Sequence, residues 1–414
     1  MIRFGLIGVG GIGSYHRASI ERLEKAGKGR LIAVAEPSPL PEQKTALEAL
    51  GIRWYSDYRS LLDEETELDA VTIATPIPFH YEMASACIHR GLWVNLEKPP
   101  VPLVQQLRSL VAADTERRVS VGFQYIGSTC MQELKRRIVA GDFGRIQEIH
   151  AGGCWPRLDG YYNRSPWAGR MIRDGNPIFD GPATNALAHL VHNVMFLAGA
   201  TESDFDVPSE VEGEMYRARP IESYDTACLR GKFGRSGIRF ALAVTHATEQ
   251  CLPFRIDVRG SKGWARLGND GATLETNLGP GLNRPETTQE LLDRNYDAFV
   301  DVLRGDRDHF ETRLQDTLGY VSATNGMLLS SGGIHDISRA HIRHYTKEEQ
   351  TGFSVAFLHE AVKHTLLNGK LFSEQGIPWA TAKPRPVRLA ELTHLLLDGD
   401  LTARTDAHPV QVAA

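Results

Sequence analysis

Short apolar runs alternate with amphipathic stretches over the first 122 residues. The apolar runs predict strands at 2–7, 31–35, 53–55, 70–74, 93–96 and 120–123. Between them, apolar positions recur every three or four residues and predict helices at 12–25, 41–50, 58–63, 80–90 and 103–114. Strands and helices that alternate in this way form a parallel sheet covered on both faces. We therefore expect an α/β domain with a doubly wound parallel sheet.

Longer alternating patterns follow. A helix is predicted at 131–139, and apolar and polar residues then alternate at 210–216, 239–245 and 254–258, with a turn at 260–263. Helical periodicity returns at 293–304 and 316–330, and 353–367 and 389–397 are further amphipathic stretches. These patterns predict an α+β domain with an open, mostly antiparallel sheet.

Length and charge narrow the class of protein. The 414 residues exceed the roughly 250–300 at which one hydrophobic core stops growing, so we expect more than one domain. A formal charge of −5 gives no electrostatic basis for binding nucleic acid. No apolar run approaches the ~20 residues that span a bilayer, no signal segment is evident, and the five cysteines form no C-x-x-C pair. We therefore expect a cytoplasmic protein with reduced thiols and without nucleic-acid or membrane partners.

A glycine-rich turn joins the first predicted strand to the first predicted helix. Residues 8–13 read Gly-Val-Gly-Gly-Ile-Gly, the G-x-G-x-x-G form of a dinucleotide-binding turn. The first glycine permits the tight turn, the second lets the backbone approach a pyrophosphate, and the third lets the helix pack closely on the strand. The amides at the start of the helix then face the anion. We expect cofactor contacts from Gly8, Gly10, Gly11, Ile12 and Gly13.

An acidic residue follows the second predicted strand. Glu36 comes directly after the run 31–35, and a carboxylate there accepts both ribose hydroxyls of adenosine. The same carboxylate repels a 2′-phosphate, and no Arg or Lys follows at 37–40. We therefore predict NAD(H) as the cofactor in preference to NADP(H).

Three further motifs carry a family resemblance. They are Thr-Pro-Ile-Pro-Phe-His at 75–80, Glu-Lys-Pro at 97–99 and Gly-Phe-Gln-Tyr at 122–125. With the glycine-rich turn, they resemble the glucose-fructose oxidoreductase/inositol dehydrogenase (Gfo/Idh/MocA) family over roughly residues 1–335. The resemblance implies an N-terminal Rossmann domain, a C-terminal open-sheet domain and a nicotinamide cofactor between them. It also implies cofactor contacts from Thr75, Pro76, His80, Glu97, Lys98 and Gln124.

The resemblance also suggests a domain plan. We expect an NAD-binding Rossmann domain at 1–122, a substrate-binding and oligomerisation α+β domain at 123–345, and a C-terminal helical extension at 346–414 packed on the rest. The exposed face of such a sheet resembles the surface that pairs subunits in this family, which implies a homodimer or homotetramer.

Lys98 is a candidate catalytic residue on its position alone. It follows a predicted parallel strand, and open α/β sheets bind ligands at the carboxyl ends of their strands. Its ammonium group can donate a hydrogen bond to a reacting oxygen, and desolvation can lower its pKa enough for proton transfer. The alternative is a surface lysine beside a proline turn.

The second domain departs from the family pattern. Family dehydrogenases often carry Asp-x-x-x-His on a helix; His189 matches, but Asn185 stands at the acidic position. An amide orients a hydroxyl but does not accept and hold a proton. We therefore expect His189 to act as the general base and Asn185 and His192 to bind substrate, although packed helix histidines are the alternative. No carboxylate or thiolate set accompanies these histidines, so we expect no metal.

An irregular segment at 155–170 combines basic and aromatic residues. Aromatic faces stack on pyranoses, and guanidinium groups form forked hydrogen bonds to hydroxyls or carboxylates. We interpret this segment as a substrate-binding loop that includes Arg157, Arg164, Trp167 and Arg170. Tyr161 or Tyr162 could also supply a phenol for proton transfer, while the alternative is a loop whose aromatics fill a domain interface. Asp180 and His246 are further substrate-site candidates.

These features favour an NAD-dependent dehydrogenase of a sugar, sugar derivative or cyclitol. Hydride would move between a ring carbon and nicotinamide C4, with Lys98 and His189 handling the proton. Asn185 leaves two alternatives open. One is glycoside cleavage or elimination through a transient keto-sugar with internal NAD recycling, and the other is an NAD-binding regulator without turnover.

Overall fold

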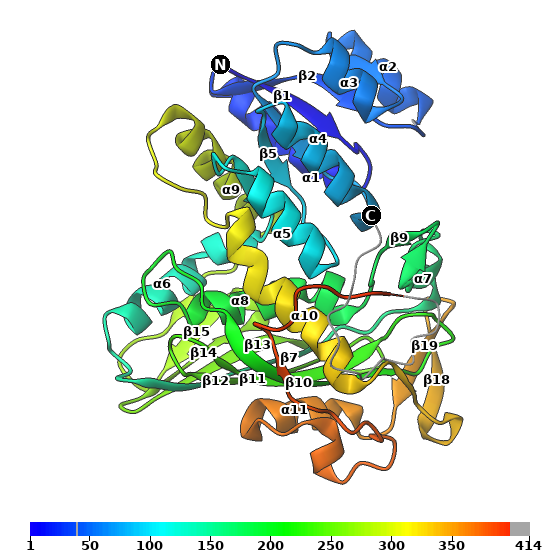
Figure 1. Ribbon diagram of the computed structural model, residues 1–414, viewed down its shortest axis with the longest axis vertical. Coiled ribbons are helices and arrows are strands. Elements are labelled where there is room, and N and C mark those ends of the chain that lie inside the picture. Colours follow the sequence, from blue (N-terminus) through cyan, green and yellow to red (C-terminus); the bar gives the residue numbers. More distant parts are fainter. Residues whose placement is uncertain (39, 398–414) are drawn as a thin grey trace. The chain divides into compact units, whose positions relative to one another are not determined.

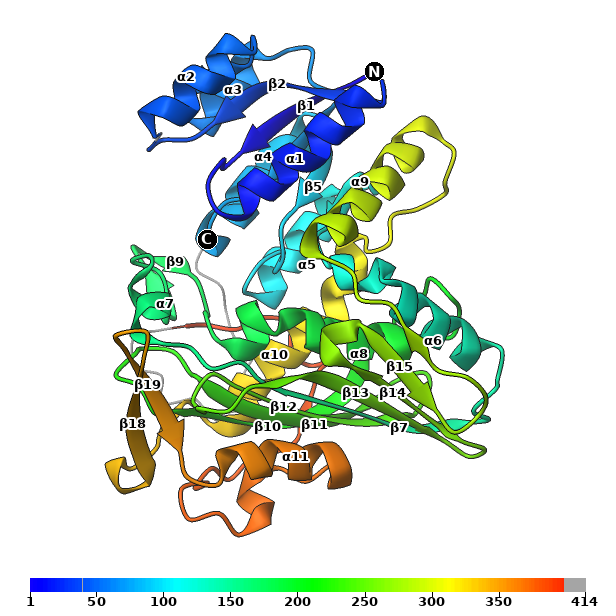
Figure 2. The same cartoon turned by 180° about the vertical axis from the view of Figure 1, so that it is seen from behind.

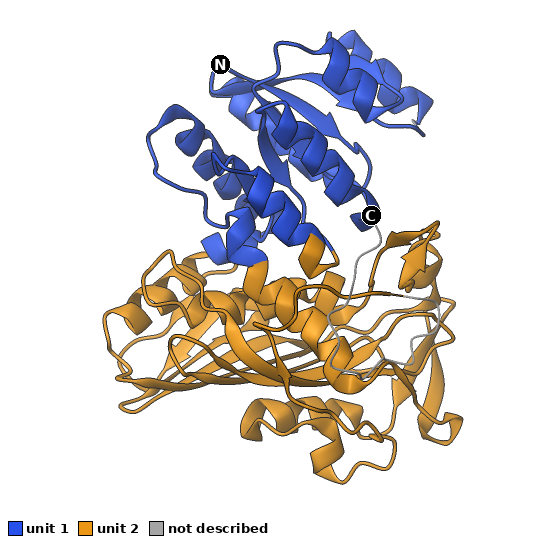
Figure 3. Cartoon of the chain, viewed as in Figure 1, with its two compact units in different colours: residues 1–101, 106–127, 286–317 blue, residues 102–105, 128–285, 318–414 orange. Residues whose placement is uncertain are grey.

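The computed structural model describes residues 1–38 and 40–397, which form two compact units. Unit 1 consists of residues 1–101, 106–127 and 286–317, and unit 2 consists of residues 102–105, 128–285 and the later part of the chain from 318 (Figure 3). Each unit has its own sheet, so the fold class expected from the sequence is confirmed. In the described part of the chain, no helix is both long and apolar enough to cross a membrane.

Unit 1 contains a parallel six-stranded sheet in the order β3-β2-β1-β4-β5-β6. Its strands are β1 (Ile2–Ile7), β2 (Gly29–Ala35), β3 (Arg53–Tyr55), β4 (Ala70–Ile73), β5 (Trp93–Leu96) and β6 (Val119–Val121). The helices between them are α1 (Ile12–Lys25), α2 (Pro41–Ala49), α3 (Tyr58–Glu64), α4 (His80–His89) and α5 (Val104–Ala113), with 3₁₀ turns η1 (Ile77–Phe79) and η2 (Gln124–Gly127). Helix coverage of both faces explains the nearly continuous apolar runs in the strands.

One helix of unit 1 comes from much later in the chain. The helix α9 (Thr288–Arg304) packs against α1 and adds Tyr296, Phe299 and Val300 to the core around Phe4. The Phe4 ring lies 6.0 Å from the Tyr296 ring and 6.2 Å from the Phe299 ring. The range 123–345 expected for the second domain therefore includes a segment that belongs to unit 1.

Unit 2 is built on a ten-stranded sheet whose main order is β16-β15-β14-β13-β7-β12-β11-β10-β17, with β20 also paired to β10. Its strands are β7 (Ile146–Cys154), β10 (Pro208–Arg217), β11 (Thr226–Phe233), β12 (Arg239–Thr245), β13 (Leu252–Gly260), β14 (Trp264–Gly268), β15 (Thr273–Thr276), β16 (Leu282–Asn283), β17 (His335–Asp336) and β20 (Val387–Arg388). Most neighbours are antiparallel, while β12 pairs with β7 and β10 pairs with β17 in parallel.

Helices lie on both sides of this sheet. The helices α6 (Thr129–Val139), α8 (Ala188–Leu197) and α10 (Leu318–Ser331) lie on one side, and α11 (Leu358–Asn368) lies on the other (Figures 1 and 2). Smaller elements are α7 (Asp159–Asn163), β8 (Ile172–Arg173), β9 (Asn176–Pro177) and the turns η3 (Pro182–Ala186), η4 (Asn269–Gly271), η5 (Leu314–Thr317, in unit 1), η6 (Arg339–His341) and η7 (Phe372–Gln375). Helices therefore pack on both faces of this sheet.

The C-terminal region corrects the expected helical extension. The stretch 353–367 is not one helix, because its first residues belong to a hairpin of β18 (Ile342–Lys347) and β19 (Gln350–Val355). Phe357 then adopts a φ of 63°, and α11 begins only after it. No helix is assigned at 389–397. Residues 398–414 of the expected extension lie outside the described residues.

This C-terminal region covers part of the sheet face that the sequence left open. Leu358, Val362, Phe372 and Trp379 pack in one core cluster with Cys228 of β11 and other sheet residues. Because the expectation of subunit pairing rested on that open face, oligomerisation stays a prediction.

Candidate functional site

The glycine-rich turn follows the carboxyl end of β1. The strand order of the sheet reverses beside it, where β1 and β4 are neighbours. Gly8 has a φ of 87°, and a Cβ added there would lie 2.6 Å from the Ala74 carbonyl oxygen. A Cβ on Gly13 would lie 2.2 Å from the Gly8 carbonyl oxygen. In contrast, apart from the adjoining residues of the chain, no described residue comes within 4 Å of a Cβ added to Gly10 or Gly11. The turn is therefore tightly packed at Gly8 and Gly13 and unobstructed at Gly10 and Gly11. This arrangement leaves room for a pyrophosphate at the start of α1, which begins at Ile12.

Glu36 follows β2 and reaches this turn. Its Oε2 lies 3.4 Å from the backbone nitrogen of Val9, and its Oε1 accepts a hydrogen bond of 3.2 Å from the backbone N–H of Ser38. These bonds hold the carboxylate beside the glycine-rich turn, where an adenosine ribose is bound in dinucleotide folds. The residues present therefore fit NAD at this edge of the sheet.

His80 joins two loops at the same edge. Its Nδ1 lies 2.8 Å from the Pro99 carbonyl oxygen, and its Nε2 lies 2.8 Å from the Thr75 carbonyl oxygen. Burial lowers the pKa of His80, and the two carbonyls oppose that shift. Because both ring nitrogens are engaged, His80 supports the loops that carry Thr75, Pro76 and Lys98.

A buried polar chain lies beneath Lys98. The backbone N–H of Lys98 donates to Glu97 Oε2 at 3.1 Å, and Glu97 Oε1 lies 3.0 Å from His16 Nε2. The other ring nitrogen of His16 lies 3.0 Å from the Tyr296 hydroxyl, which is 2.8 Å from Thr72 Oγ1. Burial raises the pKa of Glu97, but the His16 hydrogen bond and the nearby positive charges hold it below its usual value. Glu97 therefore acts as an ionised support for the Lys98 loop.

Sequence reasoning missed two members of this chain. The available signal for His16 was its helical spacing with Ile20 and Leu23, which places it on the buried face of the helix after the glycine-rich turn. Tyr296 gave no comparable signal, since it is 280 positions away from His16.

Gln124 lies in η2, directly after β6. Gln124 is 5% exposed, and its Oε1 accepts no hydrogen bond from the described residues. A buried amide oxygen without a donor is costly, so this atom fits a hydrogen bond to a bound ligand. The geometry is consistent with the cofactor contact that the resemblance implies.

Asp180 holds Asn185 in unit 2. One carboxylate oxygen of Asp180 accepts from the Gly169 backbone N–H at 2.7 Å, and the other accepts from Asn185 Nδ2 at 2.8 Å. The second bond fixes which end of the amide faces Asp180, so the carbonyl end of Asn185 is turned away from it. Asp180 is 1% exposed, and its observed role is to orient Asn185.

The two histidines of α8 differ in their surroundings. His189 lies in the first turn of the helix, close in sequence to η3, which carries Asn185. The His192 ring is fully buried and stacks on Phe205 with centroids 4.9 Å apart. Burial lowers the pKa of His192 to about 3, so it stays neutral at physiological pH. His192 packs in the interior of unit 2, and we do not include it in the reaction proposed below.

The loop 155–170 forms an aromatic and cationic cluster with His246, which follows β12. The Tyr162 hydroxyl lies 3.2 Å from His246 Nδ1, and the Tyr161 ring lies 5.4 Å from the His246 ring. Burial raises the pKa of Tyr161 to about 12 and that of Tyr162 well above its ordinary value. Both phenols are therefore protonated at neutral pH, and proton transfer by either stays a prediction.

The remaining loop candidates occupy different positions. The Trp167 ring stacks with the Arg164 guanidinium, whose Cζ is 4.8 Å from the ring centre. Arg170 is exposed and lies 3.9 Å from Glu222. Trp167 thus belongs to the cluster, whereas Arg170 lies beside the Glu222 carboxylate.

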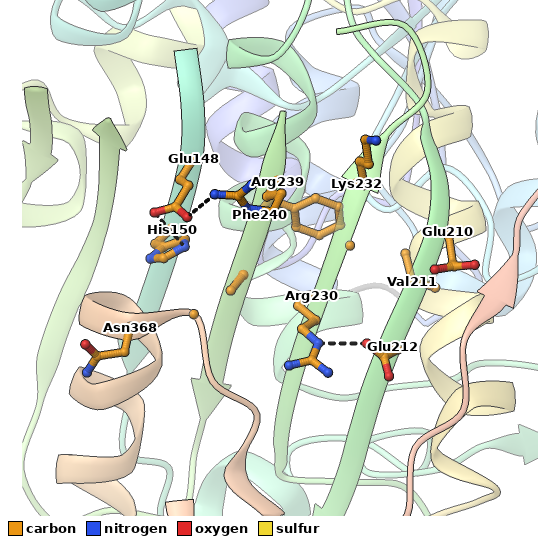
Figure 4. A pocket seen from close by; sticks show the side chains of 13 residues that line it. Glu148, His150, Glu210, Val211, Glu212, Arg230, Lys232, Arg239, Phe240 and Asn368 are labelled. Atoms are coloured by element: carbon orange, nitrogen blue, oxygen red, sulfur yellow. Dashed lines mark hydrogen bonds and ion pairs between the residues drawn. The ribbon is translucent and has the colours of Figure 1, made fainter. Parts of the chain in front are cut away.

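Unit 2 also contains a pocket with a volume of about 380 Å³. The pocket lies over β10, β11, β12 and β7, next to the end of α11 (Figure 4). Its charged side chains largely pair with one another: Arg239 bonds Glu148, and Arg230 bonds Glu212. None of the substrate or catalytic candidates from the sequence lines it. We assign it no part in the reaction.

Comparisons with known proteins agree with this geometry. Residues 2–125 match the family GFO_IDH_MocA, described as an oxidoreductase family with an NAD-binding Rossmann fold. An inositol 2-dehydrogenase from Rhizobium meliloti is 24% identical over 73% of this chain and 86% of its own length. Inositol 2-dehydrogenase 4 from Saccharopolyspora erythraea is 33% identical, but the match covers only 36% of this chain and 44% of that protein.

A solved structure extends the similarity beyond the first unit. The WlbA dehydrogenase from Chromobactrium violaceum, in complex with NADH and UDP-GlcNAcA, is 26% identical with a TM-score of 0.67. The alignment covers 80% of this chain and 93% of that one. The motifs and strand order of residues 2–125 thus match the Gfo/Idh/MocA family of oxidoreductases, as the sequence predicted, and the similarity to these relatives extends over most of the chain.

Proposed function

We propose that this chain is an NAD-dependent oxidoreductase that acts on a carbinol carbon of a sugar, sugar derivative or cyclitol. The observation that carries the proposal is the turn over Gly10 and Gly11, open outside, with the Glu36 carboxylate bonded beside it. NAD, when bound, supplies the hydride acceptor at nicotinamide C4. The inositol dehydrogenase relatives support a polyol substrate.

Lys98 and His189 are the proposed catalytic residues. The ammonium group of Lys98 donates a hydrogen bond to the reacting oxygen, and its position is set by the Glu97 carboxylate under its backbone. His189 accepts the hydroxyl proton through its neutral imidazole. Asn185, oriented by Asp180, binds a substrate hydroxyl through its amide.

Asn185, held by Asp180, also favours a second candidate function. An amide stands where family dehydrogenases often carry Asp, so the site lacks one proton acceptor. The second candidate is internal redox cycling, in which no NADH is released overall. In that case a sugar is oxidised transiently, elimination or cleavage follows beside the ketone, and the hydride returns. A regulator that binds NAD without turnover is the third possibility.

The first test mixes purified protein and NAD with aldoses, uronates, amino sugars, glycosides and inositols while absorbance at 340 nm is recorded. Sugar products are analysed in parallel. A rise at 340 nm supports the dehydrogenase. Altered sugar with a flat trace supports internal cycling, and NADH binding with every sugar unaltered contradicts both enzymatic proposals.

A further inference from the structure

The loop 155–170 is fixed beside His246 by its backbone. The N–H of Trp155 donates to the Thr245 carbonyl at 2.9 Å, and the N–H of Arg157 donates to the His246 carbonyl at 3.2 Å. This pairing continues past the end of β12, so Arg157 lies next to His246 although the two are far apart in sequence. The segment is thus held by unit 2 rather than projecting freely.

His246 presents a buried donor. Burial, and then the charges of Arg157 and other arginines, lower its pKa well below the ordinary value, so the ring is neutral. The Tyr162 phenol is protonated, and its hydroxyl lies 3.2 Å from Nδ1. When this hydroxyl donates to Nδ1, the single ring proton of His246 lies on Nε2. His246 is 1% exposed, and its Nε2 has no hydrogen-bond partner among the described residues.

Two guanidinium groups lie against one aromatic ring of the loop. The Cζ atoms of Arg157 and Arg164 lie 4.8 and 3.6 Å from the centre of the Tyr161 ring. Throughout the described ranges 1–38 and 40–397, neither arginine has a carboxylate within ion-pair distance. Two like charges sharing one ring repel each other, and an anion that bonds both would relieve that repulsion.

A third arginine, Arg219, follows β10 and links the loop to the C-terminal hairpin. The Arg219 side chain donates to the Arg157 carbonyl at 2.6 Å and to the Thr351 carbonyl of β19 at 3.3 Å. Its Cζ lies 4.9 Å from the Tyr162 ring and 4.2 Å from the Phe353 ring. The hairpin thereby holds the loop residues in place through Arg219.

The nearby carboxylates bond other groups. Asp159 is paired with Arg219. Asp225 accepts hydrogen bonds from the Arg219 and Ala218 backbone, and burial raises its pKa. Asp180 accepts from Asn185, as described above. In the described part of the chain, none of the three forms an ion pair with Arg157 or Arg164.

We propose that Arg157, Arg164 and the Nε2–H of His246 form a subsite for an oxyanion carried by the substrate, so that the substrate is an acidic sugar. A carboxylate or phosphate accepts forked hydrogen bonds from guanidinium groups, and a neutral hydroxyl does not balance their charge. The aromatic rings hold both guanidinium groups in place before the ligand arrives, which reduces the entropy lost on binding. This inference rests on the proposed function, because it assigns the substrate of the same site.

The test compares ligands matched in configuration. Glucose, galactose and mannose are each paired with the corresponding uronate and with the corresponding 6-phosphate. Calorimetry in the presence of NADH gives each dissociation constant, and absorbance at 340 nm gives kcat/KM with NAD. The variants are Arg157→Gln, Arg164→Gln and His246→Phe. Arg239→Gln is the matched control, because it removes a cation that pairs with Glu148 outside the cluster.

We expect at least one uronate or phosphate to bind more tightly than its neutral partner by about 10- to 100-fold. The Arg157→Gln and Arg164→Gln variants should lose most of that preference, while Arg239→Gln and the affinity for NADH change less than about threefold. A uronate preference identifies a carboxylate, and a 6-phosphate preference identifies a phosphate. Because Arg164 is exposed, Arg164→Gln tests the subsite without disturbing the core.

Three results would overturn the subsite. Neutral sugars that bind as tightly as their acidic partners would do so, as would no binding of any acidic member. A preference retained in both arginine variants would also contradict it. The proposed function is judged separately: oxidation of neutral sugars alone leaves it standing and rejects the subsite, whereas tight acidic binding without any turnover supports the subsite and contradicts the enzyme.

Discussion

The polar chain beneath Lys98 gives a quantitative prediction for Tyr296→Phe. Glu97 Oε1 lies 3.0 Å from His16 Nε2, and the other ring nitrogen of His16 lies 3.0 Å from the Tyr296 hydroxyl. The Tyr296 hydroxyl also lies 2.8 Å from Thr72 Oγ1. Tyr296, His16 and Thr72 are each at most 1% exposed.

The substitution removes one oxygen and leaves the packing in place. A phenylalanine ring keeps the edge contact with Phe4, but His16 Nδ1 and the Thr72 hydroxyl lose their partner. A buried polar group left without a partner costs about 1–3 kcal/mol. We therefore expect Tyr296→Phe to lower the free energy of unfolding of unit 1 by about 1–3 kcal/mol, a large part of the stability of a typical domain.

Urea unfolding measures this change, with the midpoint shift multiplied by the slope for unit 1. Tyr58→Phe is the matched control, because it removes a hydroxyl that donates to Glu82 at 2.7 Å. The Glu82 side chain is 53% exposed, so water replaces the lost bond and the cost should be about 1 kcal/mol or less. Equal losses in both variants, or a loss below about 0.5 kcal/mol for Tyr296→Phe, would refute the assigned hydrogen bonds.

Three further outcomes are expected. Lys98→Ala should lower kcat by about 100-fold or more while the dissociation constant for NADH changes less than about fivefold, and normal turnover would remove Lys98 from the mechanism. Glu36→Ala should weaken NADH binding by about tenfold and reduce the discrimination against NADPH, because it removes the acceptor for the ribose hydroxyls and the repulsion of a 2′-phosphate; fluorescence titration with both cofactors measures this, and tighter NADPH binding by the unaltered protein would contradict the predicted preference. With a thiol reagent at pH 8, Cys251 should react first, because it is the exposed cysteine and the other four are buried, and the fast phase should disappear in Cys251→Ser.

The predictability of the fold differs between its parts. The strands of unit 1 were found because burial on both faces makes them mostly apolar, as in residues 70–73. The central strand β7 was missed because its sequence, Ile-Gln-Glu-Ile-His-Ala-Gly-Gly-Cys, has neither a continuous apolar run nor a strict alternation. Its glycines are needed for close packing: a Cβ on Gly152 would lie 2.9 Å from Leu366 of α11. Such requirements arise only from the assembled structure.

The candidate site shows the same division. The cofactor turn was predictable, since its glycine pattern lies within one short segment, from Gly8 to Gly13. The role of Asp180 was not, because it depends on a hydrogen bond to Asn185 that only the folded turn creates. The hairpin that supports the 155–170 loop was also hidden, since Thr351 and Phe353 lie nearly two hundred positions further along the chain.

The late position of α9 has a consequence for synthesis. The ribosome completes residue 127 long before it reaches Arg304, and at roughly 5–20 residues per second the delay is about 10 to 35 seconds. During that time, the apolar surface of β1 and α1 around Phe4 lacks its partner helix and is open to chaperones or aggregation. A fragment that ends at residue 127 would carry the same defect permanently. A stable NAD-binding unit made by itself must therefore include residues 286–317, which the bond from the Arg294 side chain to the Gly127 carbonyl links to the end of the earlier stretch.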